Sequence, residues 1–128
     1  MAFGNSYLPP EPPGLMAAMN LVNRVRTILT KLNNNSTIHE YTPILQELDK
    51  VGVLFSHATE LRAASESHEF AERGINGKAK TTEMRDAIAG LIGPLSKLDN
   101  CNRATQLLRK AEKIVNDVLQ RDYGIGPQ

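Results

Sequence analysis

Apolar residues recur at three- and four-residue spacing along most of the chain, which is the pattern of amphipathic α-helices. The clearest case runs from Asn100 to Asp122, where the long charged side chains fall outside the apolar face. The apolar positions of this face are Ala104, Leu107, Leu108, Ala111, Ile114, Val115, Val118 and Leu119. A one-sided helix of this kind has little stability alone, so the rest of the chain is expected to cover it.

A second apolar stripe extends over residues 15–32. Leu21 and Ile28 widen it to about half of the helix circumference, which fits a helix that touches two neighbours. The polar run of residues 33–36 supplies a stop for this helix. The pattern does not decide whether the widened part of this face belongs to the core or to a partner interface.

The next helix is expected to begin with Thr42 as N-cap and Pro43 at the first helical position. A proline in the helix interior would lose a backbone hydrogen bond and clash one turn back. The apolar stripe of this helix ends at Leu61, and the helix is predicted to continue to the residue before Gly74. The pair Asn76-Gly77 then predicts a turn.

A third helix is predicted to start after Thr82, which can cap it. A kink or break is expected at Gly93-Pro94. The apolar phase up to Leu98 and the phase from Ala104 onward differ by about 180°, so one straight helix cannot serve both. The chain must therefore break near Asp99-Asn100, with Asn100 as the expected N-cap of the last helix.

Together these stripes predict an all-α fold, an antiparallel four-helix bundle with helices near residues 14–33, 43–73, 82–98 and 101–122. A three-helix core with a third helix kinked or broken at Gly93-Pro94 is the alternative. At 128 residues the chain suits a single hydrophobic core. We expect a proline-rich flexible leader over 1–14, one helical-bundle domain over 15–122 and a flexible tail over 123–128.

Composition narrows the function classes. The chain is 41% hydrophobic and 23% charged with a net charge of +1, so the overall balance indicates neither a polyanion-binding protein nor an acidic disordered tail. Its single cysteine, Cys101, cannot form an intrachain disulfide, which favours a reducing compartment. No stretch approaches 18 uninterrupted apolar residues. We therefore expect an intracellular, most plainly cytoplasmic, protein with no membrane partner.

No set of residues predicts a reaction centre. The stretch from His68 to Glu72 holds the first half of a zinc-protease helix motif, but Glu72 stands where the second histidine belongs, and two ligands do not make a site. The Gly74 to Lys78 stretch lacks the spacing and the preceding strand of a phosphate-binding loop. His57 lies beside the apolar stripe of the second helix and is interpreted as a residue at the boundary between its apolar and polar faces. We predict no enzyme activity, no catalytic residue, no metal and no cofactor.

The leading functional hypothesis is protein–protein interaction, as an adaptor or a small subunit of a larger assembly that binds an amphipathic, helical partner segment. The oligomeric state and the partner stay open. Pro9 and Pro12 in the leader have the P-x-x-P spacing of a ligand for proline-binding domains, although a stiff leader is the favoured interpretation. The residues predicted to contact a partner are Leu21, Ile28, Leu32, Leu54 and Leu61.

The alternative hypothesis is weak phosphate or nucleic-acid binding through basic faces of the first and last helices. No acidic residue lies between Leu15 and Asn35. If the two helices are adjacent, their solvated faces form a modest positive surface, although an ordinary solvated face is favoured. The residues of this basic surface are Arg24, Arg26, Lys31, Arg109 and Lys113.

One short pattern resembles a known family. Leu21-Val22-x-x-Val25 followed by Glu40-Tyr41-x-Pro43 is similar to the first two helices of focal-adhesion-targeting four-helix bundles, which are adaptors that dock leucine-rich helical motifs. The resemblance covers only this part of the chain and rests on helix and cap patterns. It implies a helical adaptor, while the shorter third helix expected here departs from that family.

Overall fold

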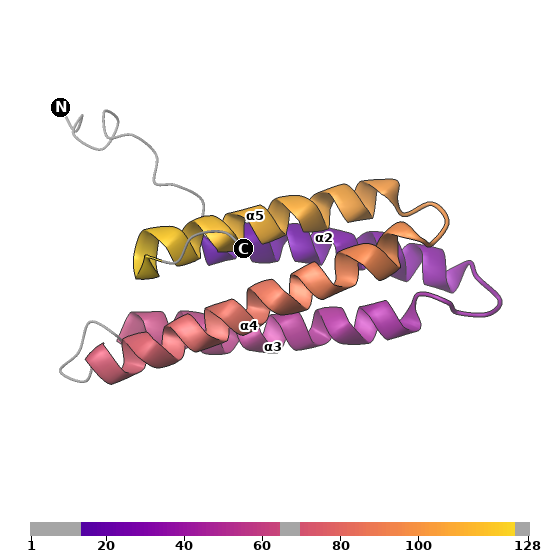
Figure 1. Cartoon of the computed structure of the whole chain (residues 1–128). Helices are drawn as coiled ribbons and strands as arrows, with labels where there is room; N and C mark the ends of the chain where they lie inside the picture. Colours follow the sequence, from indigo (N-terminus) through magenta and orange to yellow (C-terminus); the bar gives the residue numbers. More distant parts are fainter. Residues whose placement is uncertain (1–13, 65–69, 125–128) are drawn as a thin grey trace, which may run out of the picture.

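The amphipathic segments fold into four α-helices that cover one another's apolar faces. The computed structural model describes residues 14–64 and 70–124, apart from the side chains of 60–64 and 70–76. The helices, numbered as in Figure 1, are α2 (Leu15–Asn34), α3 (Thr42–Ala64), α4 (Phe70–Ser96) and α5 (Asn102–Tyr123). No β-strand occurs in the described ranges, and the predicted all-α four-helix bundle is confirmed.

Each helix packs against two others, in the cyclic order α2, α3, α4, α5 and back to α2. Successive helices run antiparallel, and Figure 1 shows α2 beside α5 and α3 beside α4. The chain therefore forms a four-helix rather than a three-helix core. The α2–α5 pair therefore lies on the opposite side of the bundle from the α3–α4 pair.

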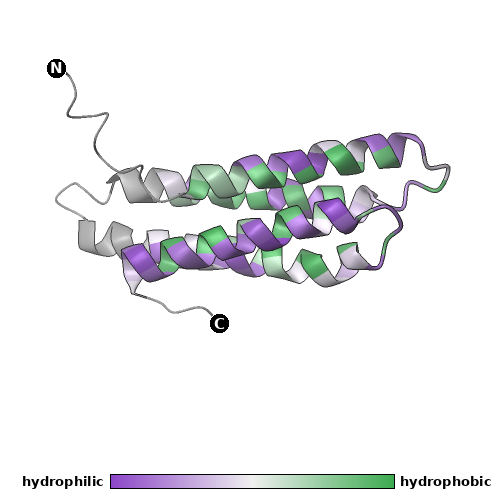
Figure 2. Ribbon diagram, turned by 90° about the horizontal axis from the view of Figure 1, so that it is seen from above, coloured by the Kyte–Doolittle hydropathy of each residue, from purple (hydrophilic) through white to green (hydrophobic). Residues whose placement is uncertain are grey.

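The predicted apolar faces of α2 and α5 form much of the core. Each predicted position of α5 is buried except Ile114, which is partly buried against the core. In Figure 2, hydrophobic residues recur along each helix between hydrophilic ones, as expected for one-sided helices. The buried side chains of α2 are Leu15, Ala18, Met19, Val22, Val25 and Leu29.

The boundary between the second and third helices differs from the prediction. Helix α3 ends at Ala64 and α4 begins at Phe70, so Gly74 and the pair Asn76-Gly77 lie inside α4 instead of ending α3. Thr82 is not a cap either, because its hydroxyl donates to the carbonyl of Lys78 at 2.8 Å within the helix. Poor helix formers cost about 1 kcal/mol each or less, which the packing of a longer α4 against α3 outweighs.

The chain reverses between α4 and α5 close to the predicted break. Helix α4 runs through Pro94 to Ser96, so the helix is not broken at Gly93-Pro94. The expected N-cap was wrong by one residue: Cys101 occupies that position, without a side-chain cap bond. Asn100 instead has a left-handed φ of 63°, which asparagine tolerates better than most residues.

The connection between α2 and α3 is held by the side chain of Asn33. Its Oδ1 accepts the backbone N–H of Tyr41 at 3.2 Å, and its Nδ2 donates to Oγ1 of Thr42 at 3.1 Å. Thr42 is the first residue of α3, so it is not the cap that the sequence predicted, and Pro43 follows inside the first turn. The first-turn N–H groups have no helical partner in any case, so proline costs little there.

No helix in the described part of the chain combines the length and the apolar character needed to cross a membrane.

Replacing Gly52 with alanine is expected to raise the free energy of unfolding by about 0.5–1 kcal/mol, because glycine is a poor helix former. The added Cβ would meet Cε of Met19 at 3.7 Å, an ordinary contact between α3 and α2. Urea unfolding measures the change. Gly90→Ala is the control. A Cβ added there would meet no atom within 4 Å, so this variant gains helix propensity without a new contact between helices. A net loss of stability in Gly52→Ala would contradict the spacing of α2 and α3.

Candidate functional site

An apolar groove lies between the start of α3 and the end of α4. It encloses about 400 Å³. Ile44 and Leu91, each 7% exposed, form its floor. Gly90 leaves the space between the helices open, because a Cβ added there would meet no atom within 4 Å. The α3–α4 groove is lined by Pro43, Ile44, Glu47, Asp86, Ala87, Gly90, Leu91 and Pro94.

Pro94 leaves a backbone acceptor beside the groove. Proline has no N–H, so the carbonyl of Gly90, four residues earlier, lacks its usual helical donor. Gly90 is exposed, and a donor outside the helix can therefore take that place. The groove thus combines an apolar floor with one polar backbone group, as ligand-binding pockets commonly do.

Carboxylates stand on both lips of the groove, Glu47 on α3 and Asp86 on α4. Glu47 accepts from Nζ of Lys50 at 2.9 Å, an exposed pair that contributes little to stability. Oδ1 of Asp86 accepts from Nε of the nearly buried Arg85 at 3.1 Å, and Nη1 of Arg85 also donates to Asn116 of α5 at 3.4 Å. Each carboxylate thus has one cationic partner on its own helix and keeps further acceptor capacity towards the groove.

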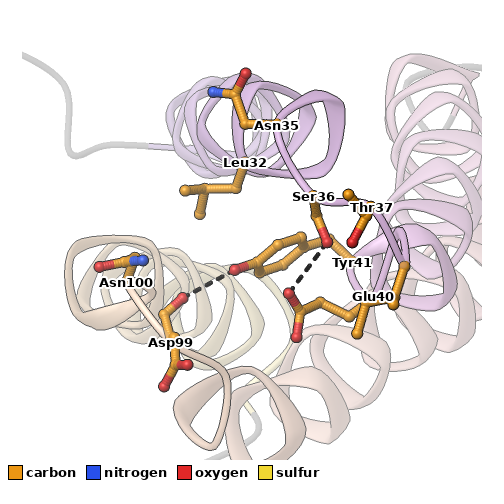
Figure 3. A pocket seen from close by; sticks show the side chains of 9 residues that line it. Leu32, Asn35, Ser36, Thr37, Glu40, Tyr41, Asp99 and Asn100 are labelled. Atoms are coloured by element: carbon orange, nitrogen blue, oxygen red, sulfur yellow. Dashed lines mark hydrogen bonds between the residues drawn. The ribbon is translucent and has the colours of Figure 1, made fainter.

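A second hollow, of about 430 Å³, lies where the α2–α3 and α4–α5 connections meet (Figure 3). The hydroxyl of Tyr41 donates to the carbonyl of Asp99 at 3.1 Å and thereby joins the two connections. Beside it, Oγ of Ser36 donates to Oε1 of Glu40 at 3.3 Å. The loop-end hollow is lined by Leu32, Asn35, Ser36, Thr37, Ile38, Glu40, Tyr41, Asp99 and Asn100.

Two groups near the loop-end hollow have shifted pKa values. Burial raises the pKa of the Tyr41 phenol above its ordinary value of 10.0, and the charges of Glu40, Cys101 and Asp99 raise it further. Burial also raises the pKa of the Cys101 thiol above 9.0, again with contributions from Glu40 and Asp99. Both groups are therefore protonated at neutral pH. A buried, protonated thiol is a poor nucleophile and a poor metal ligand.

Of the five side chains predicted to contact a partner, four lie among the described ones, and two of these four line different hollows. Leu21, Ile28 and Leu32 of α2 and Leu54 of α3 are partly buried and pack against the core. Leu32 lines the loop-end hollow, Ile28 lines a different hollow beside α5, and neither borders the α3–α4 groove. Leu61 belongs to α3, but its side chain lies outside the described ones. The widened apolar face of α2 thus packs partly against the core, and Leu21, Ile28 and Leu32 each stay partly exposed.

The basic residues predicted on α2 do not all face the same neighbouring helix. Arg26 pairs with Asp49 of α3. Arg24 instead lines a hollow with Arg103 of α5, which is consistent with the adjacency of α2 and α5 on which the alternative hypothesis depended. The predicted basic residues, all of them exposed, are Arg24, Arg26, Lys31, Arg109 and Lys113.

Sequence reasoning missed the α3–α4 groove because each of its special residues had a local explanation. Pro43 by itself indicates a helix start, and Pro94 by itself indicates a helix interruption. The available signal was the spacing of Ala87, Gly90 and Pro94, which places two small residues and a proline near one face of a helix. Pairing that face with the start of α3 needs the fold.

Within the described ranges, no group of three or more His, Cys, Asp and Glu side chains could hold a metal ion. His68, in the half motif noted above, and the Pro9–Pro12 motif lie outside those ranges. No family model, curated protein or solved structure matches the chain.

Proposed function

We propose that this protein is a non-enzymatic protein–protein interaction module, an adaptor or small subunit of a larger assembly, that binds an amphipathic partner segment in the α3–α4 groove. The observation that carries the proposal is the groove itself. Its floor of Ile44 and Leu91 is apolar, and Glu47 and Asp86 place one carboxylate on each lip. A short helical segment with apolar residues one turn apart, flanked by Lys or Arg, has the matching chemistry.

The raised pKa values of Tyr41 and Cys101 argue against either group as a base or nucleophile at neutral pH, because such a role needs a pKa near or below the working pH. Cys101 is 2% exposed. A single buried thiol also suits the reducing cytoplasm, which we propose as the location.

The test is a single added side chain in the groove. Gly90→Glu projects a charged group into open space, so it should block a partner without disturbing the fold. We expect the wild-type protein to capture a stoichiometric partner, and Gly90→Glu to weaken binding of the isolated partner segment at least about ten-fold, measured by calorimetry.

Ala79→Glu is the matched control. Ala79 is an exposed position on the same helix, about 16 Å from Gly90 along its axis, and the added charge is the same. Its affinity should equal that of the wild type. The proposal is wrong if both variants lose the partner equally, or if Gly90→Glu binds unchanged.

A further inference from the structure

Two arginines far apart in the sequence line one hollow on the side of the bundle opposite the α3–α4 groove. Arg24, Thr27 and Ile28 of α2 and Arg103 of α5 enclose about 250 Å³. The hydroxyl of Thr27 is already engaged with the carbonyl of Asn23 at 3.1 Å. None of the ion pairs among the described residues involves Arg24 or Arg103. Both guanidinium groups are thus free to bind an anion.

Two lysines extend this positive surface along the helices. Lys31 follows Arg24 by seven residues and Lys110 follows Arg103 by seven, which is about 10.5 Å along each helix and about 20° around it. All four side chains belong to exposed residues. We call this row of four cations the α2–α5 seam.

No acidic residue of α2 or α5 lies between the cations of the seam. Helix α2 contains none. On α5, Glu112 lies about 180° around the helix from Arg103, whereas Asp117 follows Lys110 by seven residues and lies on the same face about 10.5 Å beyond it, where the row of cations ends. Asp99, just before α5, lines the loop-end hollow instead. The local field is therefore positive although the whole chain has a net charge of only +1.

We propose that the α2–α5 seam binds the phosphate backbone of a nucleic acid. A guanidinium group fits phosphate oxygens with two parallel hydrogen bonds, and the lysines meet neighbouring phosphates as point charges. Helix α2 has no aromatic residue and α5 has only Tyr123 at its end. The seam would therefore bind the phosphates through charge and would not stack against bases. A membrane surface fits less well, because Ile28, the apolar residue of the hollow, packs against the core.

The seam is independent of the proposed partner groove, and salt titration of DNA binding tests it. With four phosphate contacts, the affinity for a short mixed-sequence duplex should fall about 100-fold between about 50 and 200 mM salt, measured by fluorescence anisotropy. Arg24→Gln combined with Arg103→Gln should lower affinity at least about ten-fold and reduce the salt slope by about 2.

The matched control is Arg26→Gln combined with Arg109→Gln, which removes the same charge from the same two helices. Arg26 lies about 200° around α2 from Arg24, and Arg109 about 120° around α5 from Arg103. The control should keep the wild-type affinity within about two-fold and the same slope. Circular dichroism checks that both double variants are folded.

Three results would overturn the proposal: no binding of DNA at low salt, equal losses in the two double variants, or binding of phosphatidylserine vesicles without binding of DNA. Gly90→Glu should bind DNA as the wild type does. A failure at the seam is therefore distinguishable from a failure at the groove.

Discussion

Leu108→Ala should lower the free energy of unfolding by about 2–5 kcal/mol, the range for large-to-small changes in a well-packed core. Leu108 is fully buried in α5, the helix that packs against both α2 and α4. The substitution removes three carbon atoms and leaves a cavity. The cavity closes only if α2 and α4 move towards α5. Urea unfolding followed by circular dichroism measures the loss, and an unchanged m-value shows that the unfolding transition is the same.

Leu45→Ala makes the same chemical change at a partly buried position of α3. Water already reaches part of Leu45, so less apolar area is lost and the site relaxes more easily. We expect its cost to be below about 2 kcal/mol. Equal costs at the two positions would contradict the full burial of Leu108 between α2 and α4.

The first and last helices along the described chain, α2 and α5, were predictable because their apolar residues lie on one side. In α5, Arg103, Arg109 and Lys113 all lie outside the apolar stripe, and the stripe is what the bundle buries. Residues spaced by three and four along a helix share a face whatever the tertiary structure. The end of α2 near Asn34 and the reversal before α5 followed from polar residues and a change of phase, which are also local signals.

The α3–α4 boundary does not follow from local propensity, because tertiary packing overrides it there. Gly74 and Asn76-Gly77 are good turn residues, yet α4 passes through them. Further along, Thr81 is fully buried, and its hydroxyl donates to the carbonyl of Gly77 at 2.7 Å. A hydroxyl satisfied inside the helix and a residue without a side chain let this part of α4 pack closely, which no single-helix pattern reveals.

The candidate sites were harder to predict than the helices because both lie between helices. Arg24 and Arg103 are 79 positions apart, and the sequence could not say which helices are neighbours. Likewise, Pro43 and Gly90 meet at the groove only because α3 and α4 pack antiparallel. Helix faces are local properties, whereas a site shared by two helices depends on the cyclic order of the bundle.

That order also relates the two proposed sites. The acidic lips of the groove lie on the α3–α4 side and the basic seam on the α2–α5 side, so the two surfaces face away from each other. A partner segment in the groove would leave the seam open. If both proposals hold, the bundle can join a protein to a nucleic acid through two separate surfaces.

The second large effect is expected at Asn33, which joins α2 to α3. Its side chain bonds the backbone N–H of Tyr41 and the hydroxyl of Thr42, and Tyr41 in turn donates to the carbonyl of Asp99. One amide therefore positions the residue that links both connections at this end of the bundle. Sequence alone gave Asn33 only the role of a polar residue at a helix end.

Asn33→Ala should lower the free energy of unfolding by about 1–3 kcal/mol, because it leaves the N–H of Tyr41 without its acceptor next to a buried ring. Asn33→Asp should cost less, since an oxygen can still accept that N–H while only the donor to Thr42 is lost. Urea unfolding ranks the variants. Asn34→Ala is the matched control, because Asn34 is exposed and its side chain makes no hydrogen bond to the described residues, and it should change stability by less than about 0.5 kcal/mol. If Asn33→Ala is as mild as Asn34→Ala, the amide does not hold this connection, and Tyr41 must be positioned by its packing alone.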